Sequence, residues 1–98
     1  MTRPTLADDA KRLCQQLLRI DTTNPPGNER PAAELVAGAL AEVGLKPELL
    51  EAAPSRTNVV VRHRGTGKRP PLLLTAHLDV VEADPSKWRR PPFSGDEF

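Results

Sequence analysis

The amino-acid sequence predicts an α/β fold in which two helices precede three strands of a larger mixed sheet, as at the start of an αβα sandwich. Three observations lead to this prediction. In residues 6–44, apolar side chains recur at steps of three or four, as on one face of a helix. In residues 46–77, short strand-like runs follow, and the last two are apolar at consecutive positions, which is typical of strands covered on both faces. Helices that precede such strands indicate α/β layering.

The first helix is expected to begin near Leu6 and to end near Asp21. Thr5 and Asp8 have the spacing of a capping box, in which each side chain bonds the backbone of the other residue. The apolar stripe consists of Leu6, Ala10, Leu13, Leu17 and Ile20, with Cys14 and Leu18 beside it. This position predicts that Cys14 is a small buried hydrophobe and not a nucleophile.

The second helix follows residues 21–28, a segment rich in turn-forming residues that includes two prolines and a glycine. Asn28 is the expected N-cap, and Pro31 is compatible with the helix because it falls in the first turn. The apolar stripe consists of Leu35, Val36, Ala39, Leu40 and Val43. Gly44 is expected to end the helix, because glycine readily adopts the left-handed conformation found there.

Three strands are expected at residues 46–51, 58–63 and 71–77. The connection between the last two, residues 64–70, is short enough for a hairpin. Because the third run is almost entirely apolar, we expect residues 72–76 to form a strand buried inside the sheet. Residues 81–98 are rich in proline and are expected to form loop.

Length and composition exclude several classes of protein. The 98 residues allow one domain, and 14 basic against 13 acidic residues give a net charge of +1, which offers no electrostatic attraction to nucleic acid or to an anionic membrane. One cysteine excludes a disulfide framework. No apolar run approaches the ~20 residues of a membrane helix, and the first ten residues lack the apolar core of a signal peptide. We therefore expect a cytoplasmic protein with neither a nucleic-acid nor a membrane partner.

The tripeptide His77-Leu78-Asp79 carries the clearest signal for chemistry, at the point where the third predicted strand runs into a loop. Residues i and i+2 of a strand point to the same side, so the two polar side chains are expected to converge. Ligands gather at the carboxyl ends of strands in open α/β sheets. A neutral imidazole is a good zinc ligand, and a neighbouring carboxylate can orient it. The tripeptide alone also fits a strand-end histidine beside an aspartate that caps the loop.

Two separated motifs resemble those of a known family. The first is Leu17-Leu-Arg-Ile-Asp-Thr-Thr-Asn-Pro-Pro-Gly-Asn-Glu29, and the second is Thr75-Ala-His-Leu-Asp-Val-Val81, followed by Asp84-Pro85, Trp88 and Pro92-Phe93. In this order they resemble the N-terminal signature and the first metal-binding segment of one family of zinc enzymes. That family contains aminoacylase, acetylornithine deacetylase, succinyl-diaminopimelate desuccinylase and glutamate carboxypeptidase.

The resemblance implies a zinc-peptidase-like αβα sandwich and a function. His77 would ligate one of two zinc ions, with cobalt as a substitute, and Asp79 would be the catalytic-site aspartate that positions the His77 ring. The parent enzyme would hydrolyse a linear C–N amide bond of N-acyl amino acids or small peptides, and a homodimer would be compatible with it. The family's other metal ligands and its general base would follow Phe98. Residues 1–98 are therefore expected to be the N-terminal part of the catalytic metallopeptidase domain, inactive by themselves.

Two alternatives to this interpretation stay open. In one, the chain is a small non-catalytic α/β module for binding or regulation. In the other, it is a structural α/β piece whose His-x-Asp motif is a coincidence. A Gly-Arg-Gly-x-x-Asp run within about twenty residues after Phe98 would favour the hydrolase, since a motif is confirmed by its context.

Overall fold

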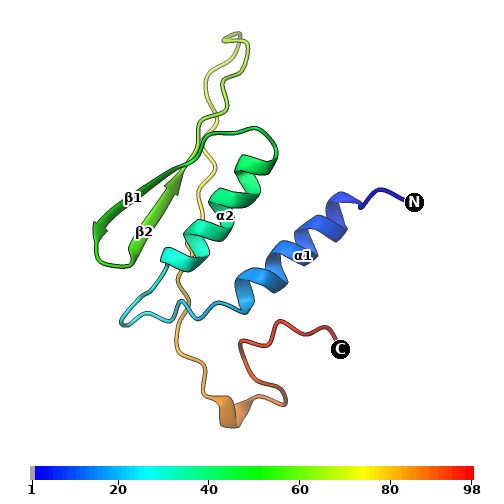
Figure 1. Ribbon diagram of the computed structural model, residues 1–98, viewed down its shortest axis with the longest axis vertical. Coiled ribbons are helices and arrows are strands. Elements are labelled where there is room, and N and C mark those ends of the chain that lie inside the picture. Colours follow the sequence, from blue (N-terminus) through cyan, green and yellow to red (C-terminus); the bar gives the residue numbers. More distant parts are fainter. Residues whose placement is uncertain (1) are drawn as a thin grey trace.

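The computed structural model describes residues 2–98 and has two helices followed by a hairpin of two strands (Figure 1). The elements are α1 (Leu6–Leu18), α2 (Arg30–Glu42), β1 (Glu48–Ala53), β2 (Arg56–Val60) and a short 3-10 helix, η1 (Pro85–Lys87). This order confirms the predicted α/β character. No helix in the described part of the chain is long and apolar enough to cross a membrane.

Helix α1 begins with the predicted capping box. The Thr5 hydroxyl oxygen accepts a hydrogen bond from the Asp8 backbone N–H at 3.1 Å, and the Thr5 backbone N–H donates to the Asp8 carboxylate at 2.9 Å. These bonds hold the pKa of Asp8 below its usual range. The helix ends at Leu18, three residues before the expected Asp21.

The predicted burial of Cys14 is wrong, because its side chain is exposed. No residue of α1 is fully buried, and the main packing contacts between elements join α2 to the hairpin. What lies against α1 is the C-terminal loop: the Gln15 side-chain amide donates to the Gly95 carbonyl at 2.9 Å, and Arg19 donates to the Ser94 carbonyl at 3.0 Å. The apolar stripe of α1 is therefore covered only in part: Leu6 and Ala10 are exposed, whereas Leu13, Leu17 and Ile20 are half-buried.

Helix α2 ends as the sequence predicts and begins one residue later than predicted. Its N-cap is Glu29 and not Asn28, and no side chain caps it. At the other end, Gly44 has φ +86°, and its backbone N–H bonds the Ala41 carbonyl while that of Leu45 bonds the Leu40 carbonyl. This is the Schellman arrangement, which favours glycine at the left-handed position.

The hairpin lies between β1 and β2, not between the second and third predicted strands. Glu48 pairs with Val60 and Ala53 with Arg56, in antiparallel register. The turn passes through Ser55, whose φ is +61°. The Ser55 carbonyl accepts hydrogen bonds from the backbone N–H groups of Glu29 and Arg30, at 2.9 and 3.2 Å. The hairpin turn therefore takes the place of a side-chain cap at the start of α2.

The apolar core of the described residues is small. Ala32 and Ala33 on α2 are the buried hydrophobic residues, and Thr57 on β2 is buried with them. Small side chains allow the helix to approach the hairpin closely, but they remove little apolar surface from water. By the area rule, burial of a methyl-sized side chain contributes only about 1 kcal/mol.

The prediction of a buried third strand at residues 71–77 is wrong. This segment is extended but belongs to no strand, and Leu72, Leu73 and Leu74 are 83–84% exposed. In Figure 1 it runs as a single yellow trace from the loop at the top of the molecule past α2. A strand requires a neighbour for its backbone hydrogen bonds, and no such neighbour for residues 71–77 is present among residues 2–98.

Because contiguous exposed apolar side chains promote association, we expect the chain to self-associate as its concentration rises. Replacing Leu73 by lysine should shift it toward the monomer, since a charge within the run opposes edge-to-edge pairing. Sedimentation velocity over a concentration series measures this. The matched control is Leu6→Lys, because Leu6 is 86% exposed but stands alone at the start of α1. A chain that stays monomeric, or an equal effect of both variants, would contradict the prediction.

Candidate functional site at His77 and Asp79

Two segments that are far apart in the sequence meet at the candidate site. Thr23 and Val80 form a parallel β-bridge. The Asn24 backbone N–H donates to the Val80 carbonyl at 2.9 Å, and the Val80 N–H donates to the Thr22 carbonyl at 3.2 Å. The buried Thr22 adds a side-chain bond from its hydroxyl to the Leu78 carbonyl at 2.8 Å. The turn after α1 thus holds the backbone of the His-Leu-Asp motif in place.

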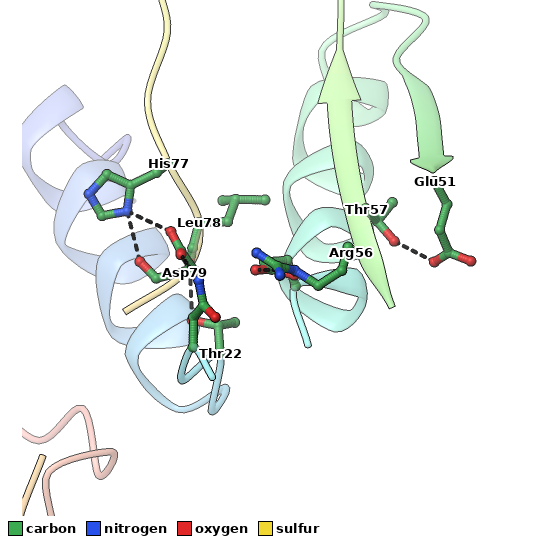
Figure 2. A network of polar contacts seen from close by, with 9 residues as sticks. Thr22, Glu51, Arg56, Thr57, His77, Leu78 and Asp79 are labelled. Atoms are coloured by element: carbon green, nitrogen blue, oxygen red, sulfur yellow. Dashed lines mark hydrogen bonds and ion pairs between the residues drawn. The ribbon is translucent and has the colours of Figure 1, made fainter. Parts of the chain in front are cut away.

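The structure brings His77 and Asp79 together, as their spacing predicts, even though residues 71–77 are not a strand. The His77 Nδ1 atom lies 2.7 Å from the backbone carbonyl oxygen of Asp79 and 3.2 Å from its carboxylate Oδ1 (Figure 2). Figure 2 also shows the second ring nitrogen on the side of the ring that faces away from Asp79.

The partners of Nδ1 determine which ring nitrogen carries the proton. A backbone carbonyl accepts hydrogen bonds and cannot donate, and an ionised carboxylate behaves in the same way. The Asp79 carboxylate is ionised at neutral pH, because a hydrogen bond from the Asn24 side chain and, next among the favourable contacts, the His77 charge hold its pKa below the usual range. Nδ1 therefore carries the proton, and the lone pair of a neutral ring is on Nε2.

The Asp79 carboxylate has a separate partner on each oxygen. Its Oδ1 faces His77, and its Oδ2 accepts a hydrogen bond of 3.0 Å from the Asn24 side-chain amide. The carboxylate is 31% exposed, whereas the His77 side chain is 82% exposed. The ring is thus held at one edge and accessible at the other.

These residues fit one part of a metal centre. An exposed imidazole whose Nδ1–H is held by a carboxylate has the arrangement seen at histidine ligands of zinc. A shallow pocket of about 280 Å³ adjoins the ring and is lined by Asn24, His77, Asp79, Val80 and Val81. Among residues 2–98, however, no three His, Cys, Asp or Glu side chains gather closely enough to hold a metal ion. The described chain therefore presents one exposed imidazole with a carboxylate and a backbone carbonyl beside its Nδ1 atom.

A second polar cluster supports the turn that leads to the site. Arg56 donates from Nε to both carboxylate oxygens of the buried Glu29, at 3.0 and 2.8 Å. Gly27 has φ +81°, and a Cβ atom there would lie 2.6 Å from Arg56 Nε. The positive φ favours glycine at this point of the turn, and any larger residue would also displace the Arg56 side chain from Glu29.

The cluster continues onto the hairpin. The Thr57 hydroxyl donates to the Glu51 carboxylate at 2.6 Å, and Arg30 contacts the same carboxylate at 3.1 Å. Figure 2 shows Thr57 and Glu51 apart from the His77 site, on the other side of the strand that carries Arg56. The Thr57 bond, followed by the Arg30 bond, holds the pKa of Glu51 below its usual range. The contacts of this cluster are internal, and they tie α2 to the hairpin.

Sequence reasoning did not identify Thr22 and Asn24 as parts of the site. Both were interpreted only as turn-forming residues, because their partners Leu78 and Asp79 stand more than fifty positions further along the chain. One signal was available. The segment that contains them, Asp21-Thr-Thr-Asn-Pro-Pro-Gly27, is one of the two motifs that carry the family resemblance.

Comparison with known proteins finds a short similarity. Over 27 residues the chain is 59% identical to N-fatty-acyl-amino acid synthase/hydrolase PM20D1 of Xenopus tropicalis. The match covers 28% of this chain and 5% of that protein. No family model matches the chain, and no solved structure matches it. The similarity relates a part of this chain to a protein named as a synthase/hydrolase.

Proposed function

We propose that the chain is the N-terminal part of the catalytic domain of a two-zinc hydrolase that cleaves a linear C–N amide bond in N-acyl amino acids or small peptides. One observation carries the proposal: His77 is exposed, and its Nδ1 is held by Asp79. This pairing leaves Nε2 as a preformed ligand atom. The similarity of a short segment to a protein named N-fatty-acyl-amino acid synthase/hydrolase supports the substrate class.

In this proposal, His77 is a metal ligand and Asp79 is the residue that orients it. His77 would hold zinc, or cobalt in its place, and the bound metal would supply polarisation of the amide carbonyl and a water that is a stronger nucleophile near neutral pH. The Asp79 carboxylate keeps the proton of the ring on Nδ1, so that Nε2 stays available. The other ligands and the general base are assigned to the remainder of the catalytic domain, because no group of three or more possible metal ligands is present among residues 2–98.

The proposal is tested by comparing the complete protein with residues 1–98 alone. We expect the complete protein to bind zinc and to release free amino acid from N-acyl amino acids, and to lose this activity on chelation. Residues 1–98 alone should bind zinc weakly and hydrolyse nothing, since a single histidine cannot close a tetrahedral site. Calorimetric zinc titration and an amine-release assay give both readouts.

Two outcomes of this comparison would contradict the proposal. A complete protein without zinc-dependent hydrolysis would favour the non-catalytic module. Tight stoichiometric zinc binding, or turnover, by residues 1–98 alone would also contradict the proposal. It would show that this segment holds a complete set of metal ligands and not His77 alone. A cytoplasmic location and a homodimer of the complete protein remain predictions.

A further inference from the structure

The Asn24 side chain forms a contact with Asp79 that the turn itself does not require. Its backbone already forms the link to Val80 that holds the two segments together. The side-chain amide makes an additional bond, 3.0 Å long, to Asp79 Oδ2. This oxygen is the one that His77 does not face, so the amide and the imidazole lie on opposite oxygens of one carboxylate.

This arrangement limits rotation of the Asp79 carboxylate. A carboxylate bonded through one oxygen can turn about its Cβ–Cγ bond, because that torsion has a broad energy profile. A second bond to the other oxygen restricts this rotation. The contact of 3.2 Å between Asp79 Oδ1 and His77 Nδ1 depends on the same torsion. Loss of the Asn24 amide would therefore free the carboxylate to leave the ring.

We propose that Asn24 is a positioning residue, which holds the Asp79 carboxylate in the orientation that keeps the His77 ring in its Nδ1–H form with Nε2 accessible. The consequence for metal binding rests on the function proposed above, whereas the effect on the ring does not. The depressed pKa of Asp79, for which the Asn24 hydrogen bond is the largest cause, is consistent with this contact.

The direct test is the tautomer of His77 in the metal-free 98-residue chain, measured by long-range ¹H–¹⁵N NMR at pH 8, where an imidazole is ordinarily neutral. We expect the Nδ1–H form to predominate in the wild type. In Asn24→Ala and Asn24→Asp, the Nε2–H form should gain population, but the change should be partial, because the Asp79 backbone carbonyl lies 2.7 Å from Nδ1 and still accepts its proton. The second variant has nearly the shape of asparagine but lacks the amide donor and places a carboxylate beside Asp79, so its effect should be larger.

The matched control is Asn28→Ala, because Asn28 is exposed in the same turn and forms no side-chain hydrogen bond within residues 2–98. Its tautomer ratio should equal that of the wild type. Circular dichroism shows whether each variant keeps its helices. If Asn24→Asp keeps its helices and an unchanged tautomer ratio, the positioning role is overturned.

A second measurement connects the ring to metal binding. In the complete protein, Asn24→Ala should weaken zinc binding by about 10–100-fold, the usual effect of losing a group that orients a ligand, whereas Asn28→Ala should not. A tautomer change without any zinc-dependent hydrolysis in the wild type would contradict the proposed function and leave the positioning role standing. An unchanged tautomer would overturn the positioning role whatever the activity.

Discussion

Replacing His77 by alanine in the complete protein is expected to lower hydrolysis by more than about 100-fold and to remove zinc from one of the two sites. In the function proposed above, the His77 imidazole is a zinc ligand: its Nδ1 atom is held 2.7 Å from the Asp79 carbonyl oxygen, and its other nitrogen faces away from Asp79. Loss of an orienting group alone commonly costs 10–100-fold in activity or metal affinity, so removal of the ligand itself should cost more. Zinc content per chain and the rate of amine release measure the two effects.

The other histidine of the chain provides the control for this experiment. His63 is exposed and lies outside the site and outside both strands, so His63→Ala should keep zinc content and turnover at wild-type values. If His77→Ala retained both, then His77 would not be a ligand, and the proposed function would lose its main support.

Replacing Arg56 by alanine is expected to lower the free energy of unfolding by about 2 kcal/mol, between the values for exposed and for fully buried ion pairs, because one partner is buried and the other is partly exposed to solvent. The Glu29 carboxylate is 8% exposed and receives two contacts from Arg56 Nε, whereas the Arg56 side chain is 41% exposed. Removing the arginine leaves a buried charge without its partner. Urea unfolding followed by circular dichroism measures the change.

Two further variants separate the ion pair from other effects of this substitution. Arg62→Ala removes an exposed arginine just after β2, and it should change stability by no more than about 0.5 kcal/mol. The double variant Arg56→Ala with Glu29→Gln should recover part of the loss, because a neutral amide costs less to bury than an unpaired carboxylate. If Arg56→Ala unfolds at the same urea concentration as the wild type, the pair does not stabilise the fold.

The features that local sequence predicted are those whose partners lie within a few residues. The capping box of α1 joins positions three apart, and the glycine that ends α2 bonds carbonyls of that same helix. The contact between His77 and Asp79 is equally local, because it joins residues two positions apart. Such interactions join residues within a few positions, so spacing and residue type can indicate them, although the same kind of reasoning gave Asn28 as a cap that does not form and expected residues 71–77 to be a strand.

The strands were harder to predict, because a strand is defined by its neighbour. Residues 48–53 and 56–60 pair with each other through the turn at Ser55. The Ser55 carbonyl of this turn accepts hydrogen bonds from the backbone N–H groups at the start of α2, about 25 positions earlier in the sequence. Residues 71–77 have the composition of a buried strand, yet three leucines in this segment are exposed. An apolar run predicts that a segment has surface to bury, but not which segment will cover it.

The sequence by itself therefore determined the α/β character, the two helices with the capped start of α1 and the glycine end of α2, and the closeness of His77 to Asp79. The tertiary structure decided what surrounds that pair: Thr22 and Asn24 reach it from a turn more than fifty positions earlier, and Gly27 allows that turn to lie against Arg56. The physical reason is that hydrogen bonds between distant segments form only after the chain has brought them together. Residue spacing does not show which distant segments will meet, whereas it relates residues within one helical turn directly, as in the capping box of α1.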